Sequence, residues 1–234
     1  MSDGRTQRRR RVAVIGVGTE VGKTHVTVAV LEALARRGEM VVGLKPIESG
    51  VGEGLTDAAQ LERVSTFHVK HPAPYRFEAA LSPHLAARLA GRTIELDVVA
   101  DWVGSSHATW TLVETAGGLL SPLSPTATNL DLVRRIAPDA LVLVAADRLG
   151  VLHEVSACEV ALRLLAPELP RAIIGLQEPV VPDGSTGSNA RELVDLRIAA
   201  HVITFPRASS SDVLTRAAAR RLLATLDPQP ERPR

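Results

Sequence analysis

Short apolar runs alternate with longer amphipathic stretches along nearly the whole chain. The runs are built from Val, Ile, Leu and Ala with few polar interruptions, as expected for strands that are covered on both faces. They predict strands at residues 12–16, 41–45, 111–114, 141–145, 172–176 and 201–205. The stretches between them predict helices at residues 23–37, 81–90, 130–136, 153–165, 189–198 and 211–226. This rhythm indicates an α/β fold, a doubly wound, mostly parallel sheet with helices on both faces.

The two ends of the chain fall outside this rhythm. Residues 1–11 finish on four successive arginines, Arg8 to Arg11, and we expect a basic, disordered tail, with contact to an acidic partner as the alternative. Residues 227–234 combine prolines with alternating charges and are expected to be loose. No repeat or low-complexity linker divides the chain between these ends, so residues 12–226 are predicted to form a single domain.

Charge and cysteine content narrow the classes of protein. A net charge of +1 gives no strong attraction to nucleic acid. No run approaches the roughly 18 consecutive apolar residues that a membrane span needs, so we expect neither a nucleic acid nor a membrane as partner. The single cysteine, Cys158, excludes an internal disulfide and fits the reducing cytoplasm, where we expect the protein. We interpret Cys158, within an apolar helical stretch, as a small core residue rather than a nucleophile.

The strongest local signal lies between the first predicted strand and the first predicted helix. The segment runs from Gly16 through Val-Gly-Thr-Glu-Val to Gly22-Lys23-Thr24, with five residues rather than the usual four between the two glycines. Backbone N–H groups in such a loop and the helix N-terminus favour a bound anion. Lys23 is predicted to reach the β- and γ-phosphates of a nucleotide, and the Thr24 hydroxyl to ligate Mg²⁺. The sequence therefore predicts a P-loop NTPase that uses ATP and Mg²⁺.

Together with this loop, the segments Lys45-Pro46-x-x-Ser49-Gly50 and Glu114-x-Ala-Gly-Gly118 resemble the dethiobiotin synthase family, in which the extra loop residue is itself a feature. The resemblance implies an ATP-dependent cyclo-ligase of biotin biosynthesis. In that reaction 7,8-diaminopelargonate and CO₂ give a carbamate, ATP converts it to a carbamic-phosphoric anhydride, and the neighbouring amine closes the ring of dethiobiotin. The resemblance also implies a homodimer, because the family's diamine site is completed across a two-fold interface.

The resemblance assigns roles to individual residues of this sequence. The implied catalytic residues are Thr19, Lys23, Lys45 and Ser49, with the lysines placing positive charge around the transferring phosphoryl group. The implied metal ligands are the oxygen donors Thr24, Asp57 and Glu114. The implied nucleotide-binding residues are Gly18, Thr19, Glu20, Val21, Gly22, Lys23, Thr24 and Gln177. The implied substrate-binding residues are Lys45, Ser49, Gly117, Gly118 and Gly150.

Several positions depart from the family pattern and leave the exact amine substrate open. Thr115 stands beside Glu114 where the family usually has Gly. His153-Glu154 stands where relatives show Asn-His, in a segment that receives the substrate carboxylate from the partner subunit. Glu154 would repel that carboxylate unless it points away. We interpret His84, in a Ser-Pro-His segment shared with relatives, as a structural histidine.

The nucleobase site also differs from the family pattern. Gln177 stands in place of an adenine-reading asparagine, and its amide has both the donor and the acceptor that reading a base edge needs. Ser188-Asn189 resembles a later version of the same motif in some relatives. We therefore expect ATP as cosubstrate and keep other nucleoside triphosphates as an alternative.

Two alternative functions keep the fold. A ParA- or MinD-like switch ATPase usually carries an early loop lysine, in Lys-Gly-Gly-x-Gly-Lys-Thr, whereas this chain has Gly18 there and Thr19-Glu20 in place of the two glycines. A divergent paralogue that acts on another amine is the second alternative, because of the departures at Thr115, His153 and Glu154.

Overall fold

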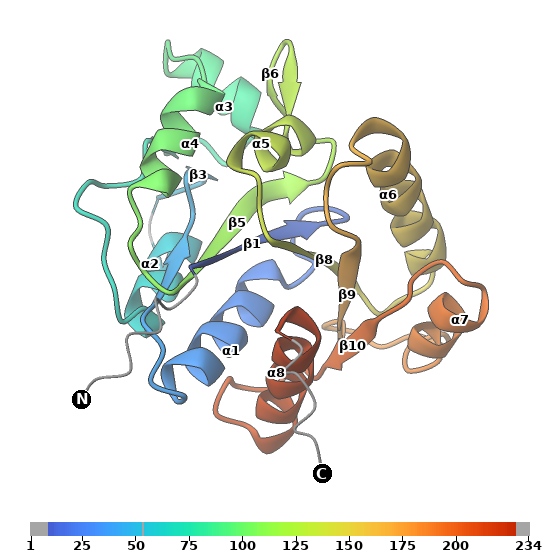
Figure 1. Ribbon diagram of the computed structural model, residues 1–234. Helices are drawn as coiled ribbons and strands as arrows, with labels where there is room; N and C mark the ends of the chain where they lie inside the picture. Colours follow the sequence, from blue (N-terminus) through green and yellow to red (C-terminus); the bar gives the residue numbers. More distant parts are fainter. Residues whose placement is uncertain (1–8, 53, 228–234) are drawn as a thin grey trace.

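Within the residues that the computed structural model describes, 9–52 and 54–227, six parallel strands form one sheet in the order β10-β9-β8-β1-β5-β2 (Figure 1). Their bounds are β1 (Arg10–Gly16), β2 (Val41–Leu44), β5 (Trp110–Gly118), β8 (Ala140–Ala146), β9 (Ala172–Gln177) and β10 (Val202–Phe205). All six predicted strands are confirmed. β1 lies between β5 and β8, the point at which the strand order reverses. Ligands of doubly wound sheets bind at such a point, beyond the carboxyl ends of the strands.

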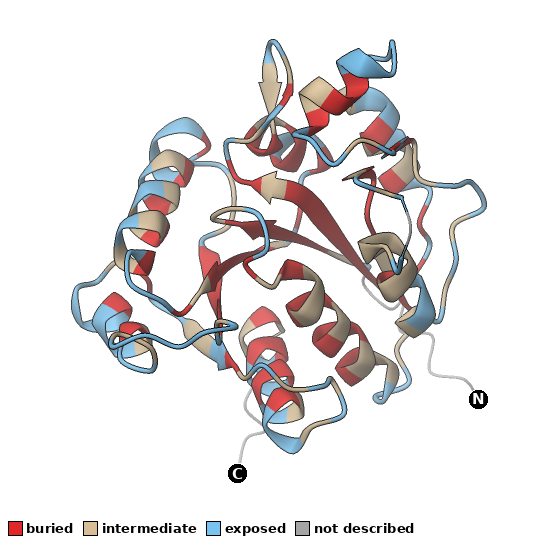
Figure 2. Ribbon diagram, turned by 180° about the vertical axis from the view of Figure 1, so that it is seen from behind, coloured by how far each residue is buried: buried red, intermediate tan, exposed pale blue. Residues whose placement is uncertain are grey.

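Helices cover both faces of the sheet, as Figure 1 shows. One face carries α1 (Lys23–Ala35), α2 (Asp57–Val64) and α8 (Val213–Leu226). The other carries α3 (Pro83–Leu89), α4 (Leu96–Gly104), α5 (Asn129–Ile136), α6 (Val151–Leu165) and α7 (Asn189–Asp195). Successive β1 side chains alternate between the two cores, since Val12 and Val14 pack on the α1 side and Ala13 and Ile15 on the other. Figure 2 shows the strands and the inward helix faces as buried.

The helices also bear on the predictions about membrane spans and about Cys158. Across 9–52 and 54–227, helices of the length and apolar character required for a membrane span are absent. Cys158 lies half-buried on α6 and packs against the core. Burial, followed by the negative charges of Glu159 and Glu154, raises the pKa of its thiol to about 11. The thiol is therefore protonated near neutral pH, as its interpretation as a core residue requires.

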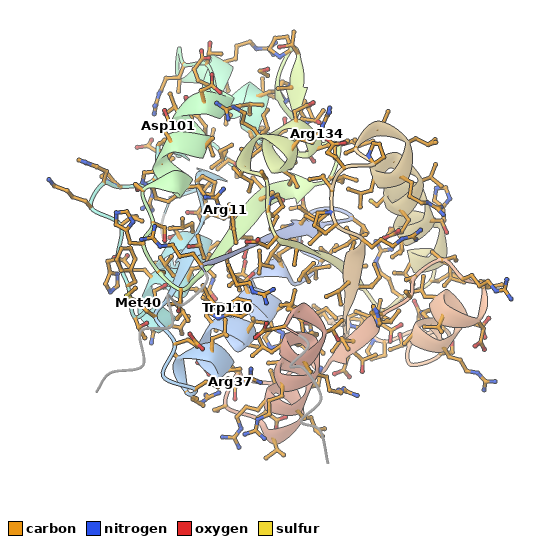
Figure 3. All side chains as sticks on the ribbon, viewed as in Figure 1. Arg11, Arg37, Met40, Asp101, Trp110 and Arg134 are labelled. Carbon is orange, nitrogen blue, oxygen red and sulfur yellow. The ribbon has the colours of Figure 1, made fainter. Side chains whose placement is uncertain are left out.

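β1 begins at Arg10 rather than at residue 12, so the end of the predicted N-terminal tail belongs to the sheet. The Arg10 N–H donates to the carbonyl of Thr109 over 2.8 Å, and the guanidinium lies over the ring of Trp110 and pairs with Asp227. The N–H of Arg11 donates to Asp139 Oδ2 over 2.8 Å (Arg11 and Trp110 are labelled in Figure 3). Assigning Arg10 and Arg11 to a tail was wrong, because a charged side chain can reach outward while its backbone pairs in a sheet. Asp227 directly follows α8 and pairs with Arg10. Residues 1–8 and 228–234 lie outside the described residues.

The region between β2 and β5 contains elements that were not predicted. They are α2, α4, β3 (Ile47–Ser49) and β4 (Tyr75–Phe77), and the short strands β6 (Pro122–Ser124) and β7 (Ala127–Thr128) follow β5. β3 and β4 pair in parallel, with Ile47 beside Tyr75. Only Leu61 is buried among the α2 residues, so this helix lacks the apolar stripe by which the others were recognised. This region matters for function because it brings α2 and β3 to the end of the sheet where the phosphate loop lies.

Candidate active site

The loop between β1 and α1 has a backbone that only certain residues permit. Gly22 adopts φ 94°, and a Cβ there would lie 2.5 Å from Cγ of Gln177, so the loop rests directly on the end of β9. Val21 is buried in the core on the α1 side and anchors the loop from within. No described side chain caps the start of α1. The N–H groups of its first turn can therefore face an anion, which supports the predicted phosphate loop.

Lys23 lies at the base of this loop and is 6% exposed. Its ammonium group donates to the carbonyl of Gly18 over 2.8 Å. Burial, and then the positive charge of Lys45, lowers the pKa of Lys23 to about 8, although Glu114 and Asp57 act in the opposite direction. A buried lysine with few compensating charges favours a bound anion, and the phosphates of a nucleotide would provide it.

The three predicted metal ligands come together beside this lysine. Glu114 is fully buried in β5 and accepts hydrogen bonds from Thr24 Oγ1 over 2.9 Å and from Thr27 Oγ1 over 3.0 Å. Lys45 joins Glu114 to Asp57, with distances of 2.7 Å and 3.0 Å from its Nζ to their carboxylate oxygens. One hydroxyl and two carboxylates form a set of hard oxygen donors, so the residues present fit Mg²⁺.

The charges in this cluster shift one another. Burial opposes the charge on Lys45, but the adjacent carboxylates of Glu114 and Asp57 outweigh it and raise the pKa of the lysine. Burial acts against the Asp57 carboxylate too, yet Lys45, together with a hydrogen bond from Thr24, holds the pKa of Asp57 below its usual value. Lys45 and Asp57 are thus both ionised near neutral pH, so the site places a positive charge among its carboxylate side chains.

The cluster forms one wall of a cleft of about 570 Å³. Bordering residues that were predicted as site residues are Thr19, Glu20, Gly22, Lys23, Thr24, Lys45, Ser49, Asp57 and Gly117. Glu48, His25 and Arg207 also border it and were not predicted. Glu48 falls at an unassigned position of the Lys45-Pro46-x-x-Ser49 motif, although an acid between a buried strand and a polar helix is a usable signal.

The glycines at the end of β5 allow the backbone to pass close to the phosphate loop. A Cβ on Gly118 would lie 2.9 Å from the carbonyl oxygen of Val17, and Gly117 adopts φ 78°. Gly118 thus serves the packing of the loop, whereas Gly117 faces the cleft. The Ser49 hydroxyl donates to the carbonyl of Leu81 over 2.7 Å, so this side chain is oriented by the start of the α3 region.

Gln177 does not lie where a base-reading residue would lie. Its side chain is 2% exposed, and its Nε2 lies 3.3 Å from each of the carbonyl oxygens of Glu178, Phe205 and Pro206. Its Oε1 lies 2.5 Å from Nδ1 of His25. The placement runs against the expectation for Gln177, because the amide lies beneath Gly22 and is already hydrogen-bonded within the protein. Asn189 is likewise 4% exposed and bound to Asp147 over 2.8 Å.

Local contacts satisfy only part of the positions that depart from the family pattern, because Thr115 Oγ1 and Glu154 Oε2 are buried without a hydrogen-bond partner among the described residues. Glu154 pairs with Arg148 over 2.8 Å, so its charge is directed to a neighbour on the same segment. Gly150 adopts φ 96° at the start of α6, and Leu149 beside it is 77% exposed. Gly150 is not among the residues bordering the cleft within a single chain. Thr115 is buried and offers its carbonyl to Lys45 at 3.3 Å, so its side chain has not displaced the lysine.

His84 lies apart from this cluster. Its Nδ1 is 3.2 Å from the hydroxyl of Ser82, two residues earlier, and the pair is exposed. The cleft beside the phosphate loop does not include it. This local contact is in keeping with the interpretation of His84 as a structural histidine.

Two curated proteins of similar sequence are named ATP-dependent dethiobiotin synthetase. A family model described as an AAA domain matches residues 10–176. The ATP-dependent dethiobiotin synthetase of Caulobacter sp. (strain K31) is 36% identical over 228 residues, which are 92% of this chain and 95% of that protein. An ATP-dependent dethiobiotin synthetase of Escherichia coli O157:H7 is 37% identical over 153 residues, which are 62% of this chain and 68% of that protein.

Solved structures are more distant in sequence but share the fold. The MinC:MinD cell division protein complex of Aquifex aeolicus matches with a TM-score of 0.57 at 13% identity, over 92% of this chain and 96% of that chain. A ParA family ATPase of Chlorobium tepidum TLS matches with a TM-score of 0.52 at 13% identity, over 94% of this chain and 93% of that chain. These likenesses confirm the predicted P-loop architecture and carry no statement about activity. The Caulobacter sp. (strain K31) protein matches over almost its whole length at 36% identity. This chain therefore belongs to the ATP-dependent dethiobiotin synthetase family.

Proposed function

We propose that this protein is an ATP-dependent dethiobiotin synthetase. It carboxylates 7,8-diaminopelargonate with CO₂, activates the resulting carbamate with ATP, and closes the ureido ring with release of phosphate. The observation that carries the proposal is the assembly in which the buried Lys45 joins the buried Glu114 to Asp57 beside Lys23. Such an assembly can hold a phosphoryl group and a second anion next to each other, and activation of a carbamate requires this arrangement.

Each residue of the cleft has a task in this reaction. The phosphate loop binds the nucleotide phosphates through its N–H groups, and Lys23 lies against the γ-phosphoryl group. Mg²⁺, held by Thr24, Asp57 and Glu114, would neutralise charge on the phosphates when bound. Lys45 stabilises the charge that develops on the carbamate and the transferring group, since its ammonium lies at the boundary of the metal ligands and the cleft.

The substrate side of the cleft is bordered by Thr19, Ser49 and Gly117. We assign to the two hydroxyls the positioning of the carbamate, and to Gly117 close backbone contact with the diamine. Gly150 would contribute from the partner subunit of a homodimer. The exposure of Leu149 beside Gly150 supports a partner subunit on that surface. We expect the protein to act in the cytoplasm.

The nucleotide specificity follows from the surroundings of Gln177. Because its amide is hydrogen-bonded to protein carbonyl groups, we propose that selection for adenine is weak and that other nucleoside triphosphates are accepted. Equal turnover with CTP and ATP supports this, and strict dependence on ATP refutes it. A switch ATPase is the less favoured function, because the loop has Gly18 where that class carries a lysine.

The experiment that tests the main proposal is phosphate release from Mg-ATP with bicarbonate, with and without 7,8-diaminopelargonate. Release that depends on the diamine, with a cyclic ureido product by mass spectrometry, is the expected result. Hydrolysis at the same rate without the diamine, by protein that binds the nucleotide, would refute it and favour the paralogue or the switch ATPase.

A further inference from the structure

Glu48 lies on β3, one residue before Ser49, and is 6% exposed on the wall of the cleft. Its Oε1 accepts from the N–H of Asp57 over 2.6 Å and lies 3.4 Å from the N–H of Ala58. The hydroxyl of Thr56 accepts from the N–H of Ala59 over 3.2 Å. The first three N–H groups of α2 are thereby satisfied, and one oxygen of Glu48 is needed to hold the helix that carries Asp57.

The other carboxylate oxygen of Glu48, Oε2, accepts no hydrogen bond from α2. Oε2 is buried and has no hydrogen-bond partner among the described residues. A buried carboxylate oxygen without a donor is unfavourable, because it has lost water and gained nothing in exchange. The geometry therefore favours an occupant of the cleft that donates a hydrogen bond and carries positive charge.

The lysines of the cleft do not supply that charge. Lys45 is bonded to Asp57 and Glu114, and Lys23 to the carbonyl of Gly18. Neither lysine is bonded to Glu48, although all three side chains border the same cleft. Glu48 lies next to Ser49 in this cleft, and its Oε2 has no cationic partner among the described residues.

We propose that Glu48 is a specificity residue that binds an ammonium group of the amine substrate through Oε2. This inference rests on the proposed function and extends it to the recognition of the diamine. One side chain then performs two tasks, because Oε1 fixes the metal ligand Asp57 through α2 while Oε2 selects a cationic substrate. A carboxylate paired with an ammonium forms a strong, charge-assisted hydrogen bond.

Glu48→Gln separates these two tasks. The amide oxygen can keep the hydrogen bonds to Asp57 and Ala58, while an NH₂ group replaces the oxygen that would receive the ammonium. We expect the KM for 7,8-diaminopelargonate to rise roughly tenfold or more, as for the loss of a hydrogen bond between charged groups. The KM for Mg-ATP, the Mg²⁺ concentration for half-maximal rate and the kcat are expected to stay within about threefold. Glu62→Gln, on an exposed position of the same helix, is the matched control and should change none of them.

Glu48→Ala removes both tasks and should raise the Mg²⁺ requirement as well as the diamine KM. An unchanged diamine KM in Glu48→Gln, or an increase only in its Mg²⁺ requirement, would overturn the inference and assign Oε2 to the metal's surroundings. A fall in kcat with a lower melting temperature and an unchanged diamine KM would overturn it too, in favour of a structural role. If the unaltered protein shows no dependence on the diamine, the proposed function itself fails, and that outcome is seen before any variant is made.

Discussion

Lys23→Met is expected to make the nucleotide-free protein more stable while abolishing its reaction. A lysine whose pKa falls from 10.5 to about 8 is charged in the folded protein at a cost of roughly 3 kcal/mol, at 1.36 kcal/mol per pKa unit. The substitution also removes the hydrogen bond to Gly18, a loss of roughly 1–2 kcal/mol. Methionine has a similar length and is apolar, so it leaves little empty space. The net gain in the free energy of unfolding is therefore about 1–2 kcal/mol.

The gain depends on pH in a defined direction. Below pH 8 the lysine is protonated in both the folded and the unfolded chain, so the full cost is present in the unaltered protein. Between pH 8 and about 10.5 the folded protein loses its proton first, and its stability rises with pH relative to the variant. The advantage of Lys23→Met should thus be complete at pH 7 and, because about 1.36 kcal/mol is recovered per pH unit above pH 8, be lost by roughly pH 9.5.

The assay is thermal unfolding at pH 7 and at pH 9.5, without nucleotide or Mg²⁺. At this chain length roughly 2–4 °C accompany each kcal/mol, so the melting temperature should rise by about 2–8 °C at pH 7 and by less at pH 9.5. Lys70→Met, at an exposed position, is the matched control and should leave the melting temperature unchanged. A Lys23→Met protein that melts at or below the unaltered protein at pH 7 would refute the reasoning, as would a gain that does not vary with pH.

Three further predictions concern the same structure. Lys45→Met leaves Glu114 buried without its charge partner and should lower the free energy of unfolding, measured by chemical denaturation, by about 3–5 kcal/mol. Millimolar Mg²⁺ should recover part of this stability. A loss below about 1 kcal/mol would contradict the account. Gly22→Ala places a Cβ 2.5 Å from Gln177 at φ 94° and should weaken ATP binding by roughly tenfold or more in calorimetry, so unchanged affinity counts against the loop geometry. Cys158, with a pKa raised to about 11, should react with a thiol reagent at pH 8 far more slowly than after unfolding in denaturant; equal rates would disprove its burial.

The strands and most helices could be predicted because each strand is apolar on both faces. Val12 and Ala13 occupy opposite cores, so no polar position interrupts the run. The arginines before Val12 gave the opposite impression, since side-chain charge says little about whether a backbone pairs with Trp110 in the next strand. Helix α2 escaped prediction for the corresponding reason, because it buries only Leu61.

The phosphate-binding half of the site could be predicted from local order, whereas the other half depends on tertiary contacts. Lys23 and Thr24 follow a strand and a glycine loop within a few residues, and this order alone places them. Glu48 acquires its position only when α2 folds back so that the N–H of Asp57 meets it. Gln177 shows the limit of the strand-end rule, since the end of a strand can face the underside of a loop as readily as a ligand.

The candidate site residues come from two separate parts of the fold, and the region between β2 and β5 is one of them. Lys23, Thr24 and Glu114 belong to the sheet and its first helix, where a displacement would disturb both cores. Glu48, Ser49 and Asp57 belong to the excursion that leaves the edge strand β2, and Lys45 links this excursion to Glu114. Substitutions in the excursion that leave Asp57 in place could therefore change the amine substrate, while Lys23, Thr24 and Glu114 keep their positions in the sheet and first helix. The segment that leaves the edge strand β2 is therefore the part of this fold in which the substrate preference can change.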